Sequence, residues 1–178
     1  MVGIDGNGQT LLLAWAVVES ENKESWTWFL TCLRNAIPEC IGMTLISDRD
    51  KGLLAADEIV FGDGINRIIC CFHLKANLCK RYGGQLSSLF WSIANAESER
   101  EYHTEFAILQ QQKPTAAQYL STIPKHLWVT AFYRAPHYGH KTSNIVESMN
   151  NVFRANRELS ILDLLNEIWY CNRYGLLV

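Results

Sequence analysis

The fold is decided by the stretch Met43-Thr-Leu-Ile-Ser-Asp48-Arg-Asp-Lys51-Gly52. Residues 43–46 predict a short buried strand, and the residues from Gly52 onward open a helix. Asp48 stands at the carboxyl end of that strand. Because open α/β sheets bind ligands just beyond the carboxyl ends of their strands, Asp48 is a candidate catalytic or binding residue. Capping of the following helix is the alternative role, since aspartate is a favoured N-cap.

A second strand follows the helix. The pattern predicts that the helix ends near Phe61, that residues 62–64 form a turn, and that residues 67–71 form another short buried strand. A strand, a helix and a strand in this order predict a parallel pair joined by a right-handed crossover. We therefore expect the two strands to be neighbours in one sheet.

The segment before residue 43 predicts a hairpin and a helix. Residues 1–4 and 11–18 read as the two strands, because Asp5-Gly-Asn-Gly8 supplies the positive φ of a tight turn. Asn22 is expected to cap a helix running to about Ala36, with one apolar face packed on a sheet. The residues of that face are Trp26, Phe29, Leu30 and Leu33.

The segment from residue 73 to about 133 shows helical patterns only. Ser98 and Glu101 form a capping-box pair, and Pro114 and Pro124 divide the remainder into short helices. The pattern predicts an all-helical insertion, and the last of its helices carries Leu127, Trp128, Ala131 and Phe132.

A polar helix is expected to begin near residue 142 or 143. Residues 147, 150, 151 and 154 are expected to share one polar face of this helix. A polar face is typical of an exposed helix, but a lone glutamate among asparagines, followed by arginines, also suits a metal site beside bound phosphate. Ser160 is expected to cap a last, amphipathic helix. The polar side chains concerned are Asn144, Glu147, Asn150, Asn151, Arg154 and Arg157.

Composition narrows the class of protein. The chain has 178 residues, a 48% hydrophobic content and a net charge of −2, which predict a domain with a sizeable core and no general attraction for nucleic acid. Any DNA contact must come from a local basic patch. No apolar run approaches the ~20 residues of a membrane span. Six scattered cysteines are typical of reduced thiols in the cytosol or nucleus.

Several motifs, taken in order, resemble the core of Mutator-like (MULE) transposases. The same core occurs in the far-red-impaired-response family of plant transcription regulators. The motifs are Asp5-Gly-Asn-Gly, Glu21-Asn-Lys-Glu-Ser-Trp26-Thr-Trp-Phe-Leu30, Ser47-Asp-Arg-Asp-Lys-Gly-Leu53, Cys70-Cys-Phe-His73 with Ala76-Asn77, and Thr142-Ser-Asn-Ile-Val-Glu-Ser-Met-Asn150.

This resemblance implies an α/β, RNase H-like fold whose mixed sheet is interrupted by an all-helical insertion. Residues 1–72 would form the core, 73–140 the insertion, and 141–178 the catalytic-helix region and C-terminal helix. The resemblance further implies a triad of two Asp and one Glu that holds Mg²⁺ or Mn²⁺ and acts on DNA in the nucleus. Asp48 then matches the second Asp, and Glu147 matches the Glu.

The family's first catalytic Asp lies on a central strand upstream of the hairpin, and we expect this strand to be missing here. The chain alone would then be inactive or nearly so, as a fragment of a longer protein or a decayed reading frame. The hairpin and the Asp48 strand would each lose a pairing neighbour. A non-catalytic, domesticated module in transcription regulation or protein–protein interaction is the alternative, and a homo-oligomer is compatible with either function.

The remaining candidates are basic and metal-binding side chains. Arg49 and Lys51 beside Asp48 could contact phosphate or could be solvated surface charges. Cys70 and His73 match the family's Cys-x-x-His motif. They could bind zinc together with a second pair, but we favour a core cysteine and a helix-start histidine. The second pair is His137 and His140.

Overall fold

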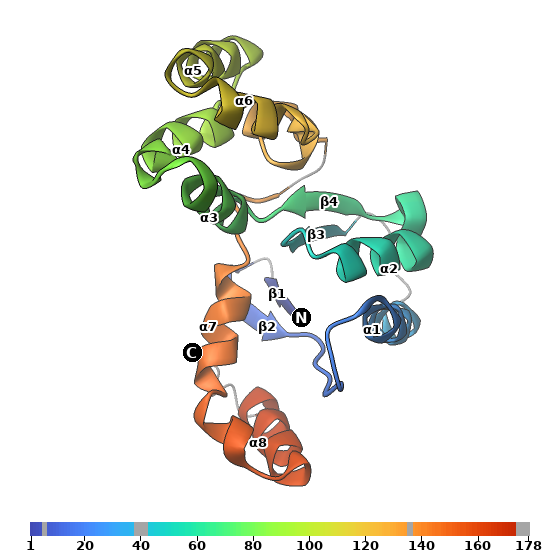
Figure 1. The fold of residues 1–178 in the computed structure, drawn as a ribbon. Coiled ribbons are helices and arrows are strands. Elements are labelled where there is room, and N and C mark those ends of the chain that lie inside the picture. The colour runs from blue at the N-terminus through green and yellow to red at the C-terminus, as the bar shows by residue number, and fades with distance from the viewer. Residues whose placement is uncertain (5–6, 38–42, 135–136, 174–178) are drawn as a thin grey trace. The chain divides into compact units, whose positions relative to one another are not determined.

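A computed structural model describes residues 1–4, 7–37, 43–134 and 137–173. The chain divides into two compact units, drawn in Figure 1. Unit 1 comprises Met1–Glu19 and Ser143–Val178, and unit 2 comprises Ser20–Thr142. In the described ranges, no helix has both the length and the apolar character that crossing a membrane requires.

Unit 1 contains the predicted hairpin. Strands β1 (Val2–Ile4) and β2 (Thr10–Leu12) pair antiparallel, with Val2 opposite Leu12. The second strand is shorter than the predicted 11–18, because the backbone N–H groups of Leu13 and Ala14 both donate to the Met1 carbonyl and end the ladder there. The predicted turn residues Asp5 and Gly6 lie outside the described residues.

Two α-helices lie in the described part of unit 1. They are α7 (Asn144–Val152) and α8 (Ile161–Arg173). Ser160 caps α8 as predicted, since its hydroxyl accepts a hydrogen bond from the Asp163 N–H at 3.3 Å. The prediction that Arg154 lies on the same helix as Glu147 is wrong. The helix ends at Val152, after two asparagines of low helix propensity, and the segment Ala155–Glu158 is a 3₁₀ helix.

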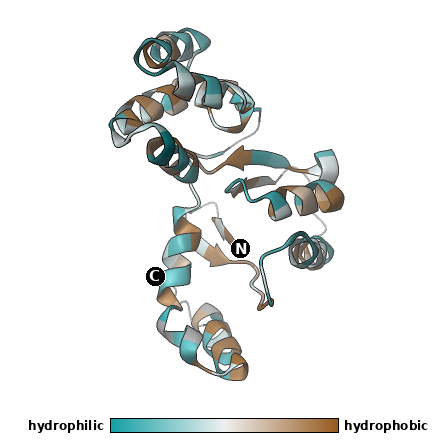
Figure 2. Cartoon of the chain, in the orientation of Figure 1, coloured by the Kyte–Doolittle hydropathy of each residue, from teal (hydrophilic) through white to brown (hydrophobic). Residues whose placement is uncertain are grey.

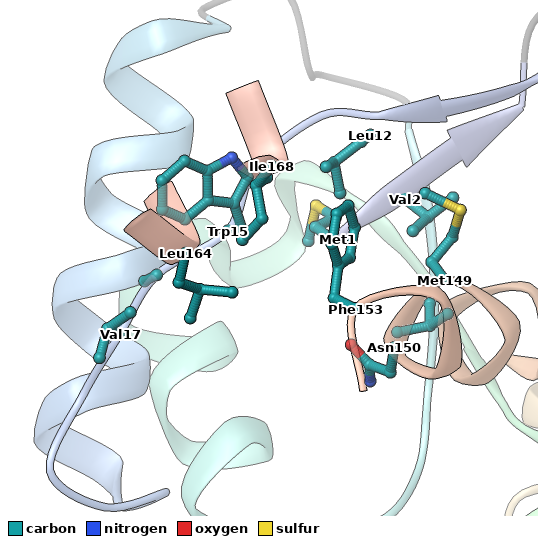
Figure 3. A pocket seen from close by; sticks show the side chains of 12 residues that line it. Met1, Val2, Leu12, Trp15, Val17, Met149, Asn150, Phe153, Leu164 and Ile168 are labelled. Carbon is teal, nitrogen blue, oxygen red and sulfur yellow. The ribbon is translucent and has the colours of Figure 1, made fainter. Parts of the chain in front are cut away.

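The hairpin and both α-helices of unit 1 line an apolar cavity of about 180 Å³ that is partly open to solvent. Figure 3 shows the Trp15 ring beside Leu164 and Ile168, with Met1 and Phe153 on the other side of the cavity. Ile168 is buried, as its place in the predicted amphipathic pattern requires. The full lining is Met1, Val2, Leu12, Trp15, Ala16, Val17, Val146, Met149, Asn150, Phe153, Leu164 and Ile168.

Unit 2 contains the predicted strand–helix–strand. Strands β3 (Thr44–Ser47) and β4 (Asn66–Ile69) pair in parallel, and α2 (Lys51–Phe61) connects them. The prediction that the two strands are neighbours is therefore confirmed. Figure 2 shows the carboxyl end of β4 in the apolar colour, and Ile68 and Ile69 are indeed buried. This strand ends two residues earlier than predicted, because the next helix begins at Cys71.

The described strands form two separate two-stranded sheets, β1–β2 and β3–β4. The chain is thus a mixed α/β protein, as predicted from its sequence. The RNase H-like arrangement of a single mixed sheet stays a prediction.

Helix α1 (Lys23–Ala36) begins where the sequence placed it. Asn22 caps it, since its side-chain oxygen accepts from the Ser25 N–H at 2.8 Å. The prediction that its apolar face packs mainly on a sheet is wrong, because α1 packs chiefly against α2. Helix α2 offers its own apolar surface there, and the Arg34 guanidinium donates to the Val60 carbonyl at 2.5 Å.

A helical bundle makes up the rest of unit 2. In Figure 1 the bundle and the α1–α2 pair lie on either side of the β3–β4 pair. The last helix expected before residue 133 is instead two 3₁₀ turns, Lys125–Leu127 and Thr130–Phe132. The α-helices of the bundle are α3 (Cys71–Tyr82), α4 (Ser87–Asn95), α5 (Glu99–Gln112) and α6 (Pro114–Ser121).

The core of this bundle is built on aromatic rings. Trp128 is completely buried and stacks on Phe90, with ring centroids 5.6 Å apart and planes 13° from parallel. Ser98 accepts from the Glu101 N–H at 3.2 Å, as a capping box requires, but the Glu101 carboxylate accepts from Glu97 instead of Ser98. The prediction that Ser98 caps this helix is therefore confirmed. The reciprocal hydrogen bond to the Glu101 carboxylate comes from the Glu97 N–H.

The bundle also holds the segment that follows it. The Lys141 carbonyl accepts from the Cys71 N–H at 2.9 Å, and the Lys141 ammonium donates to Asn95 Oδ1 at 2.7 Å. The same ammonium also donates to the Ala94 carbonyl and the Thr130 hydroxyl. Burial lowers the pKa of Lys141. These bonds fix residue 141 to the start of α3 and to the end of α4.

Candidate functional site

Asp48 follows β3 directly and is exposed. Its Oδ1 atom accepts a hydrogen bond from the Asp50 N–H at 3.2 Å. Asp50, and not Asp48, caps α2, because its carboxylate accepts from the Leu53 N–H at 2.8 Å. The capping role considered for Asp48 is therefore wrong, and the helix start does not use its carboxylate.

The two basic neighbours of Asp48 are both exposed. Arg49 Nη1 lies 3.5 Å from the Tyr119 hydroxyl on α6, and Lys51 is the first residue of α2. Ion pairs within the described ranges involve Arg67 and not the basic neighbours of Asp48. Contact of Arg49 and Lys51 with phosphate stays a prediction.

Glu147 lies in the first turn of α7, in unit 1. A carboxylate is favoured there, because the unpaired N–H groups of a helix start carry partial positive charge. Asp48 belongs to unit 2, so the joint use of the two carboxylates stays a prediction. Within the described part of the chain, no three His, Cys, Asp or Glu side chains gather into a metal-binding group.

The other polar candidates from the sequence are spread along unit 1. Asn144, Asn150 and Arg154 are exposed, and Asn150 also lines the apolar cavity. The side chain of Arg157 lies outside what the structure describes. A role for these side chains in binding phosphate or DNA stays a prediction.

Cys70 and His73 lie together at the start of α3. Cys70 is completely buried, and its sulfur is 3.3 Å from Nδ1 of the partly buried His73. The Cys70 N–H donates to the Ser47 carbonyl at 2.7 Å, which ties this helix start to the strand that carries Asp48. His137 packs its ring on Tyr133, and its Nδ1 accepts from Gly139. Cys70 is thus a core cysteine and His73 a helix-start histidine, as favoured from the sequence, and zinc binding by the four side chains stays the disfavoured alternative.

The neighbouring Cys71 is completely buried as well. Its thiol donates to the Trp128 carbonyl at 3.4 Å, and burial raises its pKa to about 11. Thiols react as thiolates, so this thiol is inert at ordinary pH while the protein is folded.

Alkylation with iodoacetamide at pH 8 tests whether the buried cysteines react more slowly than an exposed one. We expect the exposed Cys32 to be modified in the native protein, and Cys70 and Cys71 only after unfolding in urea. Peptide mass spectrometry of native and unfolded samples measures the two populations. Modification of Cys71 as fast as Cys32 in the native protein would contradict its burial.

Two features near Asp48 were missed from the sequence. Asp50 could have been recognised as the cap, because it precedes the first helical residue. No local pattern pairs Arg49 with Tyr119, which is 70 positions away.

Comparison with known proteins identifies part of the chain. A family model described as the MULE transposase domain matches residues 1–77. This range contains Asp48, Cys70 and His73. No curated protein and no solved structure matches the chain. The resemblance found in the sequence is therefore confirmed for residues 1–77, which are similar to the MULE transposase domain.

Proposed function

We propose that this chain is a transposase-derived domain of the kind that cleaves and joins DNA strands with divalent metal ions, with Asp48 and Glu147 as metal ligands. The observation that carries the proposal is the position of Asp48: an exposed carboxylate at the carboxyl end of β3, within the segment that matches the MULE transposase domain. The proposal includes an RNase H-like fold, DNA as the partner and a nuclear location.

The residues fit a hard divalent cation such as Mg²⁺ or Mn²⁺. Such cations take oxygen ligands, and the Asp48 carboxylate accepts one backbone N–H and has no cation within ion-pair distance in the described residues. When bound, the cation would favour attack on phosphorus and stabilise the leaving oxygen.

The protein contributes the position of that carboxylate. The Asp50 N–H holds Oδ1 of Asp48, and Asp50 is itself fixed as the cap of α2. Just after the neighbouring strand β4, the Cys70 N–H donates to the carbonyl of Ser47, the residue before Asp48. Hydrogen bonds from two sides thus restrict the backbone that carries the proposed ligand.

A thermal melt with and without Mn²⁺ tests the proposal. A ligand bound only by the folded state stabilises it, by about 1.4 kcal/mol when its concentration is ten times the dissociation constant. This corresponds to roughly 2–6 °C in the melting temperature of a chain of this size. We expect Mn²⁺ to raise the melting temperature of the wild type and to have little effect on Asp48→Asn and Glu147→Gln.

Two exposed acids supply matched controls. Asp63 lies in the 3₁₀ turn after α2, and Glu158 lies in unit 1. Asp63→Asn and Glu158→Gln should keep the full Mn²⁺ shift. A shift that survives in Asp48→Asn, or that is absent from the wild type, would contradict the metal site and favour the non-catalytic module.

A further inference from the structure

A basic and aromatic cluster lies beside the strand end that carries Asp48. Three segments of unit 2 contribute to it: the loop after β3, the end of α3 and the end of α6. Its members, which we call the Arg–Tyr cluster, are Arg49, Arg81, Tyr82 and Tyr119.

The geometry of the Arg–Tyr cluster is defined by short distances. The Arg81 guanidinium carbon lies 5.4 Å from the centre of the Tyr82 ring and 5.8 Å from that of Tyr119. The two rings have centroids 5.9 Å apart. Arg49 Nη1 reaches the Tyr119 hydroxyl at 3.5 Å. Two guanidinium groups therefore converge on one tyrosine from two separate segments.

Charge in the Arg–Tyr cluster is not neutralised by the protein. Both arginines are exposed, and in the part of the chain that the structure describes neither forms an ion pair with a carboxylate. Stacking on Tyr82 and Tyr119 holds the Arg81 side chain in place, so binding an anion costs less side-chain entropy than it would with a free surface arginine.

We infer that the Arg–Tyr cluster binds the phosphodiester backbone of a DNA strand next to Asp48. Guanidinium groups bind phosphate through paired N–H donors, and tyrosine hydroxyls are common phosphate contacts. The net charge of −2 gives the whole chain no attraction for DNA, so a local cluster must supply it. The inference rests on the proposed function, because that function makes DNA the partner.

Fluorescence anisotropy of a labelled DNA duplex in EDTA tests the inference without any metal. We expect Arg49→Gln with Arg81→Gln to weaken binding roughly tenfold and to reduce the slope of log K against log salt concentration by about 2. Tyr119→Phe keeps the ring and loses the hydroxyl, and should weaken binding by a smaller factor. Both arginines are exposed, so we expect the circular dichroism spectrum of the double variant to match that of the wild type.

Two other exposed arginines provide a control with equal loss of charge. Arg100 lies on α5 and Arg134 follows the 3₁₀ turn Thr130–Phe132, and their double glutamine variant should keep the wild-type affinity and slope. An equal loss in this control would mean that net charge alone governs binding, and would overturn the inference. The inference would also be overturned if the Arg49/Arg81 variant bound DNA as tightly as the wild type, or if the wild type did not bind DNA. Displacement of the DNA by inorganic phosphate at the same concentration as the DNA would overturn it as well.

The Mn²⁺ shift tests the proposed function and the DNA affinity tests this inference, so either one can be contradicted without the other. Asp48→Asn removes the proposed metal ligand and a negative charge, and in EDTA it should bind DNA as tightly as the wild type or more tightly. A missing Mn²⁺ shift with a DNA affinity that depends on Arg49 and Arg81 would contradict the metal site alone. A normal Mn²⁺ shift with a DNA affinity independent of both arginines would contradict the Arg–Tyr cluster alone.

Discussion

Replacing Arg67 with methionine is expected to lower the free energy of unfolding by about 3–5 kcal/mol. The Asp57 side chain is only 3% exposed and pairs with Nε of Arg67, whose Nη2 donates to the Gly62 carbonyl at 2.5 Å. Without Arg67 the Asp57 carboxylate stays buried with no cation to pair with. Urea denaturation followed by circular dichroism measures the loss.

Two further variants separate the buried ion pair from surface charge. Glu58 is 73% exposed and lies 3.9 Å from Arg67, so Glu58→Gln should cost less than about 1 kcal/mol. The combination of Asp57→Leu with Arg67→Met removes both charges and should recover much of the lost stability. A loss below about 1 kcal/mol for Arg67→Met alone would show that the pair does not hold α2 to β4.

Replacing Trp128 with alanine should cost about 3–5 kcal/mol, as expected for the loss of a large buried aromatic side chain. Trp128 is completely buried and stacks on Phe90 in the core of the helical bundle. The bundle cannot close the resulting cavity without moving several helices. Differential scanning calorimetry or urea denaturation gives the change in unfolding free energy.

Exposed Trp28 provides the control for this variant. Its side chain is 54% exposed on α1, so Trp28→Ala should change stability by less than about 1 kcal/mol. Trp128→Phe should cost less than Trp128→Ala, because the ring stays and the buried Nε1 donor, which has no hydrogen-bond partner in the described residues, is removed. Equal losses for Trp128→Ala and Trp28→Ala would contradict the burial of Trp128.

Features fixed by near neighbours in the chain could be predicted from the sequence. Asn22, Ser98 and Ser160 each cap a helix through a backbone N–H three residues later, so a window of four residues contains the whole interaction. The parallel β3–β4 pair was equally predictable, since a short crossover leaves few other arrangements.

Features that depend on distant segments could not be predicted in this way. The apolar face of α1 was visible in the sequence, but its partner α2 was not, because a hydrophobic pattern does not say what covers it. The ion pair between Asp57 and Arg67 and the contact of Arg49 with Tyr119 both join different elements. For the candidate site, the sequence predicted the position of Asp48 after its strand but not the role of Asp50 as the helix cap.

The junction between β4 and α3 restricts how unit 2 can move. Only Cys70 separates the strand from the helix, and its N–H is bonded to the Ser47 carbonyl of the neighbouring strand. A junction of one residue with its backbone bonded leaves no room for a hinge. The helical bundle should therefore rotate together with the β3–β4 pair as one rigid body, and a force applied at the far end of α3, where Arg81 lies, would be transmitted to the residue before Asp48.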